Sequence, residues 1–252
     1  MMLRRLALIS ALFLAAAPAA AEPTEVAVRV IAKGAKFVGT SMGGARIVLR
    51  DAETGAILAE GVTEGSTGDT ARIMTDKLDR KAARWTEGAG GFVATLDIDA
   101  PTRVRAEAYG PLAQRQAAAT ATSEQWVVPG RDVTGGDGWL IELPGIAVDI
   151  LSPAAHSAAN GAIMIDANVV LMCGCPLTPG GLWDADGYEV AAMIWRKGKK
   201  VDDVPLAYAG TASRFSATYT PKASGAYRIV VFAHEAASGN TGLDETTVRV
   251  QR

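Results

Sequence analysis

Short segments in which apolar and polar residues alternate recur along most of this sequence, and they constrain its fold more than any other feature. Two of them are TEVAVRVIA at 24–32 and TTVRVQR at 246–252. A period of two places the apolar side chains on one face of a β-strand. Glycine, proline, asparagine and aspartate break the runs at short intervals. The pattern therefore predicts an all-β chain made of two β-sandwiches.

Several neighbouring runs have the spacing of hairpins. ARIVLRD at 45–51 and AILAEGV at 56–62 flank a short turn-like insert that contains glycine. GFVATLDID at 91–99 and TRVRAEAYG at 102–110 are expected to form a second pair. The basic run RKGKK at 196–200 lies between two strand-like segments and is read as a hairpin turn. The segment 111–125 has weak periodicity, which leaves an edge strand or a loop open.

One segment of the N-terminal half has helical spacing instead. Within residues 69–85, Met74, Leu78, Ala82 and Trp85 fall on one stripe. Asp69 or Thr70, at the start of this segment, could cap a helix. We therefore expect a short helical insertion in the N-terminal sandwich, with an unstructured polar insertion as the alternative.

The C-terminal half contains a run of candidate strands whose spacing suggests a seven-strand sandwich. Its segment ASGAYRIVVFA at 223–233 resembles the glycine-x-tyrosine strand start of immunoglobulin-like domains. The Cys–Trp–Cys pattern of antibody domains is absent. Proline and glycine interrupt the alternation near 144–152. We therefore predict an N-terminal sandwich over 22–147 and an immunoglobulin-like sandwich over 148–252.

The first 21 residues read as a signal peptide. Arg4 and Arg5 precede an apolar stretch at 6–17, and three alanines at 19–21 form a small-residue cleavage site. The apolar stretch is shorter than the ~20 residues that a membrane helix needs. We expect a periplasmic or secreted protein with no membrane span in the mature chain.

Composition and motifs argue against nucleic-acid binding and catalysis. The chain carries 25 basic and 27 acidic residues, without an extended basic stripe. GTSMG at 39–43 matches a hydrolase serine motif, but a strand-like run follows it where the motif needs a helix. DADG at 184–187 begins like a calcium loop and lacks the remaining acidic ligands, so we read it as a turn. We expect no enzyme activity.

The chemically distinctive feature is the stretch MCGCP at 172–176, which contains both cysteines of the chain. Residues two apart on a strand face the same side, so Cys173 and Cys175 begin by pointing together. Gly174 lets the backbone bend further, and Pro176 extends the residue before it. We expect the two sulfurs to converge on a rigid, exposed turn.

Three interpretations of this cysteine pair are open. Adjacent thiolates favour soft metals, so we expect capture of Cu(I) by Cys173, Cys175, Met172 and His234. Further donors that the fold could bring near are His156, Met164 and Met193. Alternatively, the pair is incidental, and the protein is a structural module that docks another exported protein. A redox-active dithiol is the third reading.

Overall fold

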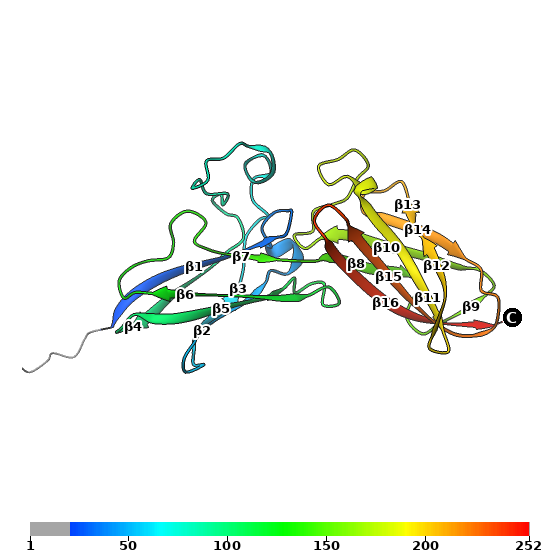
Figure 1. Ribbon diagram of the computed structural model, residues 1–252, viewed down its shortest axis with the longest axis horizontal. Helices are drawn as coiled ribbons and strands as arrows, with labels where there is room; N and C mark the ends of the chain where they lie inside the picture. The colour runs from blue at the N-terminus through cyan, green and yellow to red at the C-terminus, as the bar shows by residue number, and fades with distance from the viewer. Residues whose placement is uncertain (1–20, 252) are drawn as a thin grey trace, which may run out of the picture.

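The computed structural model describes residues 21–251 and confirms the all-β expectation. The predicted signal peptide lies outside the described residues except for Ala21. Two β-sandwiches follow one another along the longest axis of the molecule (Figure 1). Among residues 21–251, no helix is long and apolar enough to cross a lipid bilayer.

The N-terminal sandwich contains one sheet of three strands and one of four. In the first, β1 lies between an antiparallel β4 and a parallel β7. The second has the order β3-β2-β5-β6 and is antiparallel throughout. The bounds are β1 Glu22–Ala32, β2 Arg46–Asp51, β3 Ile57–Val62, β4 Phe92–Ile98, β5 Thr102–Gly110, β6 Ala119–Val127 and β7 Trp139–Leu143.

One predicted hairpin is confirmed, and one predicted pairing is wrong. β2 and β3 pair antiparallel across the turn at residues 52–56. β4 and β5 do not pair, because β4 hydrogen-bonds to β1 while β5 hydrogen-bonds to β2 and β6. The short connection at residues 99–101 carries the chain from one sheet to the other. Alternation shows which side chains face the core, but it does not show which strand is the neighbour.

The helical insertion is present but shorter than its sequence pattern suggested. Only Ala71–Thr75 (η2) forms a helical turn, of the π type, and Asp69 Oδ1 accepts a hydrogen bond from the backbone N–H of Arg72 at 2.7 Å. Trp85 does not extend the helix. Its ring lies 4.1 Å from the buried guanidinium of Arg29, and its backbone N–H donates to Asp137 Oδ1 at 2.7 Å. These long-range contacts override the local helical spacing.

The C-terminal sandwich has sheets of four and five strands, in the orders β13-β14-β10-β8 and β12-β11-β15-β16-β9. The bounds are β8 Ile146–Ser152, β9 Ser157–Asn160, β10 Ile163–Leu171, β11 Tyr188–Arg196, β12 Lys199–Pro205, β13 Ala207–Tyr208, β14 Arg214–Tyr219, β15 Gly225–Glu235 and β16 Asn240–Gln251. Two short 3-10 turns, η1 Thr40–Met42 and η3 Ala185–Gly187, complete the elements. The predicted hairpin turn in RKGKK is confirmed between β11 and β12.

Strand order and one tyrosine support the immunoglobulin-like prediction. The order β8-β10-β14-β13 reproduces the A-B-E-D sheet of that fold, and β11, β15 and β16 reproduce its C-F-G strands. Tyr227 lies near the start of β15, and its hydroxyl donates to the carbonyl of Ala223 at 2.8 Å. This contact is the tyrosine corner of immunoglobulin-like sandwiches. The sandwich has nine strands where the spacing predicted seven.

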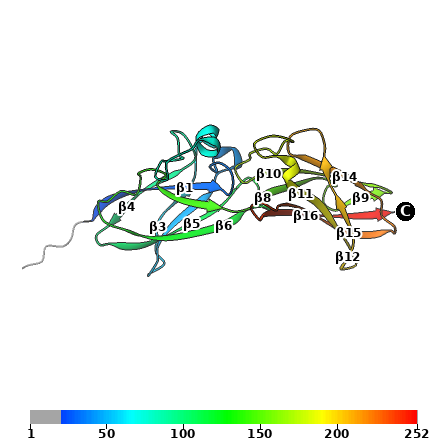
Figure 2. The same ribbon diagram turned by 45° about the horizontal axis from the view of Figure 1, so that its top comes forward.

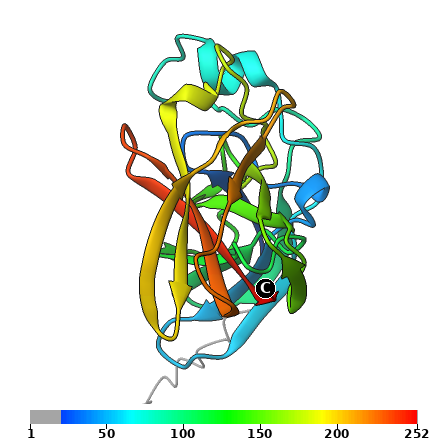
Figure 3. The same ribbon diagram turned by 90° about the vertical axis from the view of Figure 1, so that its right-hand side faces the viewer.

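The two sandwiches meet end to end, and side chains connect them. In Figure 1 the chain passes from the first sandwich to the second between β7 and β8; Figure 2 shows the two sandwiches turned by 45°, and Figure 3 views the molecule along the long axis. The indole N–H of Trp183 donates to the carbonyl of Gly34 at 3.0 Å, and Lys33 Nζ donates to the carbonyl of Ser238 at 2.9 Å. One cluster of buried apolar residues runs from the first sandwich into the second. The two sandwiches therefore share a packed junction.

Candidate functional site

The cysteine pair forms a tight turn directly after β10. Cys173 and Cys175 are joined by a disulfide, with their Cα atoms 5.4 Å apart. The N–H of Gly174 donates to the carbonyl of Leu171 at 2.7 Å, and the N–H of Leu171 donates to the carbonyl of Cys175 at 3.1 Å. Gly174 has a φ of +79°, which residues with a side chain rarely adopt. The convergence of the two sulfurs, expected from their spacing, is confirmed.

The expectation that this turn is exposed is wrong. Cys173 is 1% and Cys175 4% exposed, and Met42 of the N-terminal sandwich lies against the turn between them. A Cβ atom placed on Gly174 would lie 2.9 Å from the sulfur of Met42 in η1. The disulfide therefore lies at the junction of the two sandwiches, where it has little access to solvent.

A small cleft remains beside the disulfide. Its volume is about 210 Å³, and residues of both sandwiches line it. The N-terminal sandwich contributes Lys36, Ser41 and Thr67, while Pro176 and Trp183 follow the cysteines in the chain. Lys36 Nζ donates to Thr70 Oγ1 at 2.9 Å, so its ammonium is held by a neighbouring hydroxyl. The cleft is too small for a drug-sized ligand.

The loop after the cysteines is held in place by its own hydrogen bonds. Asp184 Oδ1 accepts from the N–H groups of Gly180 at 2.9 Å and Asp186 at 3.2 Å. The N–H of Thr178 donates to the carbonyl of Trp183 at 3.1 Å. The reading of DADG as a turn is therefore confirmed, and this turn presents Trp183 to Gly34 of the other sandwich.

The soft donors considered with the cysteines are spread over the C-terminal sandwich. Met172 is fully buried, with its sulfur against the linker residue Gly145. His234 lies on β15, in register with Glu189 of β11, and His156 Nδ1 lies 2.9 Å from Thr247 Oγ1. Within residues 21–251, no group of three or more His, Cys, Asp and Glu side chains is placed to hold a metal ion. Neither histidine therefore joins both cysteines in such a group.

Sequence reasoning overlooked one sulfur. Met42 belongs to the GTSMG motif, which drew attention only to its serine, yet its thioether contacts the turn at Gly174. β2 follows η1, as its alternation predicted. No spacing rule links Met42 to Cys173, because they belong to different sandwiches. The only sequence signal for this contact was the presence of a methionine in a glycine-rich turn.

Comparisons with known proteins add little to this geometry. No protein-family model and no curated protein sequence matches the chain. Among solved structures, the fibronectin(III)-like modules of Clostridium thermocellum CbhA are similar at 12% identity and a TM-score of 0.30, over 90% of each chain. An engineered protein matches 46% of this chain at 21% identity and a TM-score of 0.33, and the match spans 22% of that protein. Dimeric latent PorU from Porphyromonas gingivalis matches 83% of this chain at 12% identity and a TM-score of 0.28, over 20% of its own length.

Proposed function

We propose that this chain is an exported, non-catalytic β-sandwich module that docks another exported protein. The observation that carries its non-catalytic part is the state of the disulfide. Both sulfurs are bonded to each other and buried, and residues of both sandwiches line the cleft beside them. Such a pair is unavailable as a nucleophile, because the thiolate is the reactive form of cysteine.

The disulfide then has a structural role at the junction. A disulfide that closes so short a loop removes little entropy from the unfolded chain. Its effect is instead to fix the turn that packs against Met42. In this proposal the fixed turn keeps the two sandwiches in one arrangement, and a preorganised binding surface loses less conformational entropy on binding.

Docking is tested by affinity capture from a periplasmic extract, using the mature chain and its Cys173→Ser/Cys175→Ser variant. We expect both proteins to capture the same partner, because the cysteines lie inside the molecule. The purified partner should then bind the two proteins with dissociation constants within about threefold of each other, since buried changes leave the surface intact. A partner that binds only the disulfide-containing chain would contradict a purely structural role.

Capture of Cu(I) by the reduced protein is the second candidate, and the sulfur of Met42 favours it. Reduction would free two thiolates, and the thioether of Met42 lies against Gly174, the residue between them. Two thiolates with one thioether are a soft donor set for Cu(I). The donor set thus differs from the one expected from the sequence. Met42 takes the third position, while Met172 faces the linker and His234 lies on β15.

This candidate predicts a specific competition result. Reduced protein should withdraw about one Cu(I) per chain from a chromogenic Cu(I) chelator. Cys173→Ser/Cys175→Ser should withdraw none, and Met42→Leu should weaken binding about tenfold through loss of one soft ligand. Met164→Leu is the matched control, because Met164 is 55% exposed on β10. Equal Cu(I) affinity of the reduced wild type and the double-serine variant would rule this function out.

A further inference from the structure

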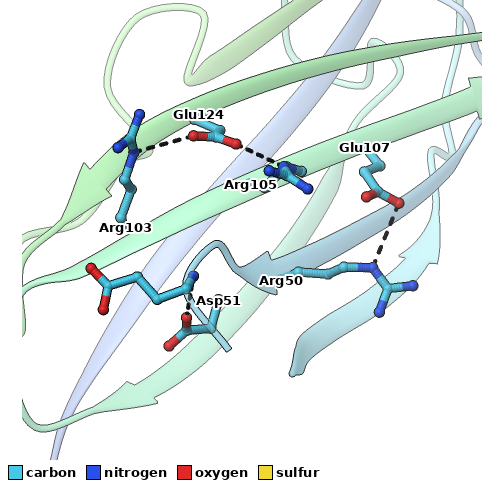
Figure 4. A network of polar contacts seen from close by, with 7 residues as sticks. Arg50, Asp51, Arg103, Arg105, Glu107 and Glu124 are labelled. Carbon is cyan, nitrogen blue, oxygen red and sulfur yellow. Dashed lines mark hydrogen bonds and ion pairs between the residues drawn. The ribbon is translucent and has the colours of Figure 1, made fainter. Parts of the chain in front are cut away.

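A charged face with an exposed tryptophan covers the outer side of the β3-β2-β5-β6 sheet. We call it the arginine face, and it consists of Arg50, Arg103, Arg105, Glu107, Glu124 and Trp126. Figure 4 shows five of these residues on neighbouring strands. Their positions alternate with buried ones, such as Val104 and Ala106 of β5. The sheet therefore supports the arginine face as a flat, regular surface.

Two of the arginines are held in place by one carboxylate. Glu124 Oε2 lies 3.1 Å from Arg103 Nε, and Glu124 Oε1 accepts a hydrogen bond from Arg105 Nε at 2.7 Å. The bond from Arg105 lowers the pKa of Glu124, so this bridge stays ionised. In the part of the chain that the structure describes, the terminal amino groups of Arg103 and Arg105 form no hydrogen bond. Both guanidiniums are thus oriented, with donors left for a ligand.

The arrangement carries an unfavourable repulsion within the sheet. Arg50 lies directly opposite Arg105 in the β2–β5 register. Like charges in directly opposite positions destabilise a sheet. Three arginines share two glutamates here, although the chain as a whole has a net charge of −2. The excess positive charge on this face complements an anionic ligand.

Trp126 adds an apolar platform next to these charges. It lies opposite Arg103 in the β5–β6 register and is 60% exposed. Tryptophan side chains are mostly well buried, as Trp139 is at 5% exposure. An exposed indole offers a flat apolar surface on which a ring can stack.

We propose that the arginine face binds an acidic polysaccharide. A sugar ring stacks on Trp126, and the uronate carboxylate of the same or the next sugar accepts hydrogen bonds from Arg103 and Arg105. Arginine suits this role because its fork of donors matches carboxylate geometry. An exposed tryptophan together with excess arginine favours this ligand over two others. An acidic peptide would not need the tryptophan platform, and a neutral glycan would not need the excess arginine. This proposal is independent of the docking of a protein partner.

The test is affinity electrophoresis of the mature chain in gels that contain polygalacturonate. We expect retardation that weakens as salt rises, because surface charges are screened. Trp126→Ala and Arg103→Gln/Arg105→Gln should each raise the apparent dissociation constant at least tenfold. Arg228→Gln is the matched control, because Arg228 is also exposed and ion-paired but lies on β15 of the other sandwich.

Four results would overturn the proposal. Wild type that migrates equally with and without polygalacturonate would do so, as would equal retardation of wild type and Trp126→Ala. Equal affinity for poly-glutamate, or for carboxyl-reduced polygalacturonate, would show that charge alone or the sugar backbone alone is recognised. Because every changed residue is exposed, thermal unfolding by circular dichroism should show that all variants remain folded.

Discussion

Gly242→Ala is expected to lower the free energy of unfolding by about 3 kcal/mol, an effect at the upper end of overpacking changes. Gly242 lies in β16, where the backbone of β8 comes very close. A Cβ atom on Gly242 would stand 1.7 Å from the carbonyl oxygen of Ile146 and 2.6 Å from its carbonyl carbon. Backbone atoms cannot rotate away as a side chain can, so the two strands have to separate.

The neighbouring contacts make this separation costly. Asn240 Oδ1 accepts from the N–H of Gly145 at 2.7 Å, and Asp244 Oδ2 accepts from the N–H of Ile150 at 2.8 Å. These bonds hold β16 against β8 on both sides of Gly242. Moving the strands apart lengthens both hydrogen bonds and leaves the backbone N–H donors of Gly145 and Ile150 unsatisfied.

Urea unfolding measures the effect as a fall in the transition midpoint at an unchanged m-value. Gly187→Ala is the control, because a Cβ atom there meets nothing within 4 Å and its φ is not positive. We expect the control to stay within about 0.5 kcal/mol of wild type. A Gly242→Ala protein as stable as this control would contradict the close approach of β8 and β16.

The sequence predicted local features of the fold well, and the reason is physical. The β2–β3 hairpin and the turn between β11 and β12 depend on a few residues that are close in the chain. The glycine-x-tyrosine strand start at 225–227 was also recognised from a short segment, and the structure adds that the Tyr227 hydroxyl forms a tyrosine corner there. Fold class followed from alternation, because a period of two is a property of each strand by itself.

Features that depend on distant residues were not predictable in this way. Met42 of η1, in the other sandwich, lies against the turn at Gly174, and no spacing within the MCGCP stretch contains that information. Trp85 fits a helical stripe, yet it lies against Arg29 of β1. The arginine face was not predictable from the sequence either, because it combines residues of β2, β5 and β6. The sequence left most of the β6 segment open as either an edge strand or a loop.

Gly174→Ala is expected to destabilise the protein by about 2 kcal/mol, through two separable causes. The first is the backbone, because a φ of +79° costs a residue with a Cβ atom roughly 1 kcal/mol or more. The second is packing, because the new Cβ atom would lie 2.9 Å from the sulfur and 3.0 Å from the Cγ of Met42. The thioether has to move, and with it the contact between the disulfide turn and the N-terminal sandwich.

Gly180→Ala separates the two causes. Gly180 has a φ of +65°, and a Cβ atom there meets nothing within 4 Å, so this variant reports the backbone cost alone. In a Met42→Ala background, Gly174→Ala should lower the free energy of unfolding by the backbone cost alone. The packing cost should disappear, because no thioether remains to be displaced. Urea unfolding of the four proteins in this cycle gives the coupling between Gly174 and Met42 directly. If the losses of unfolding free energy caused by Gly174→Ala and Met42→Ala simply add, the turn at Gly174 does not pack against η1. The disulfide turn then does not couple the two sandwiches.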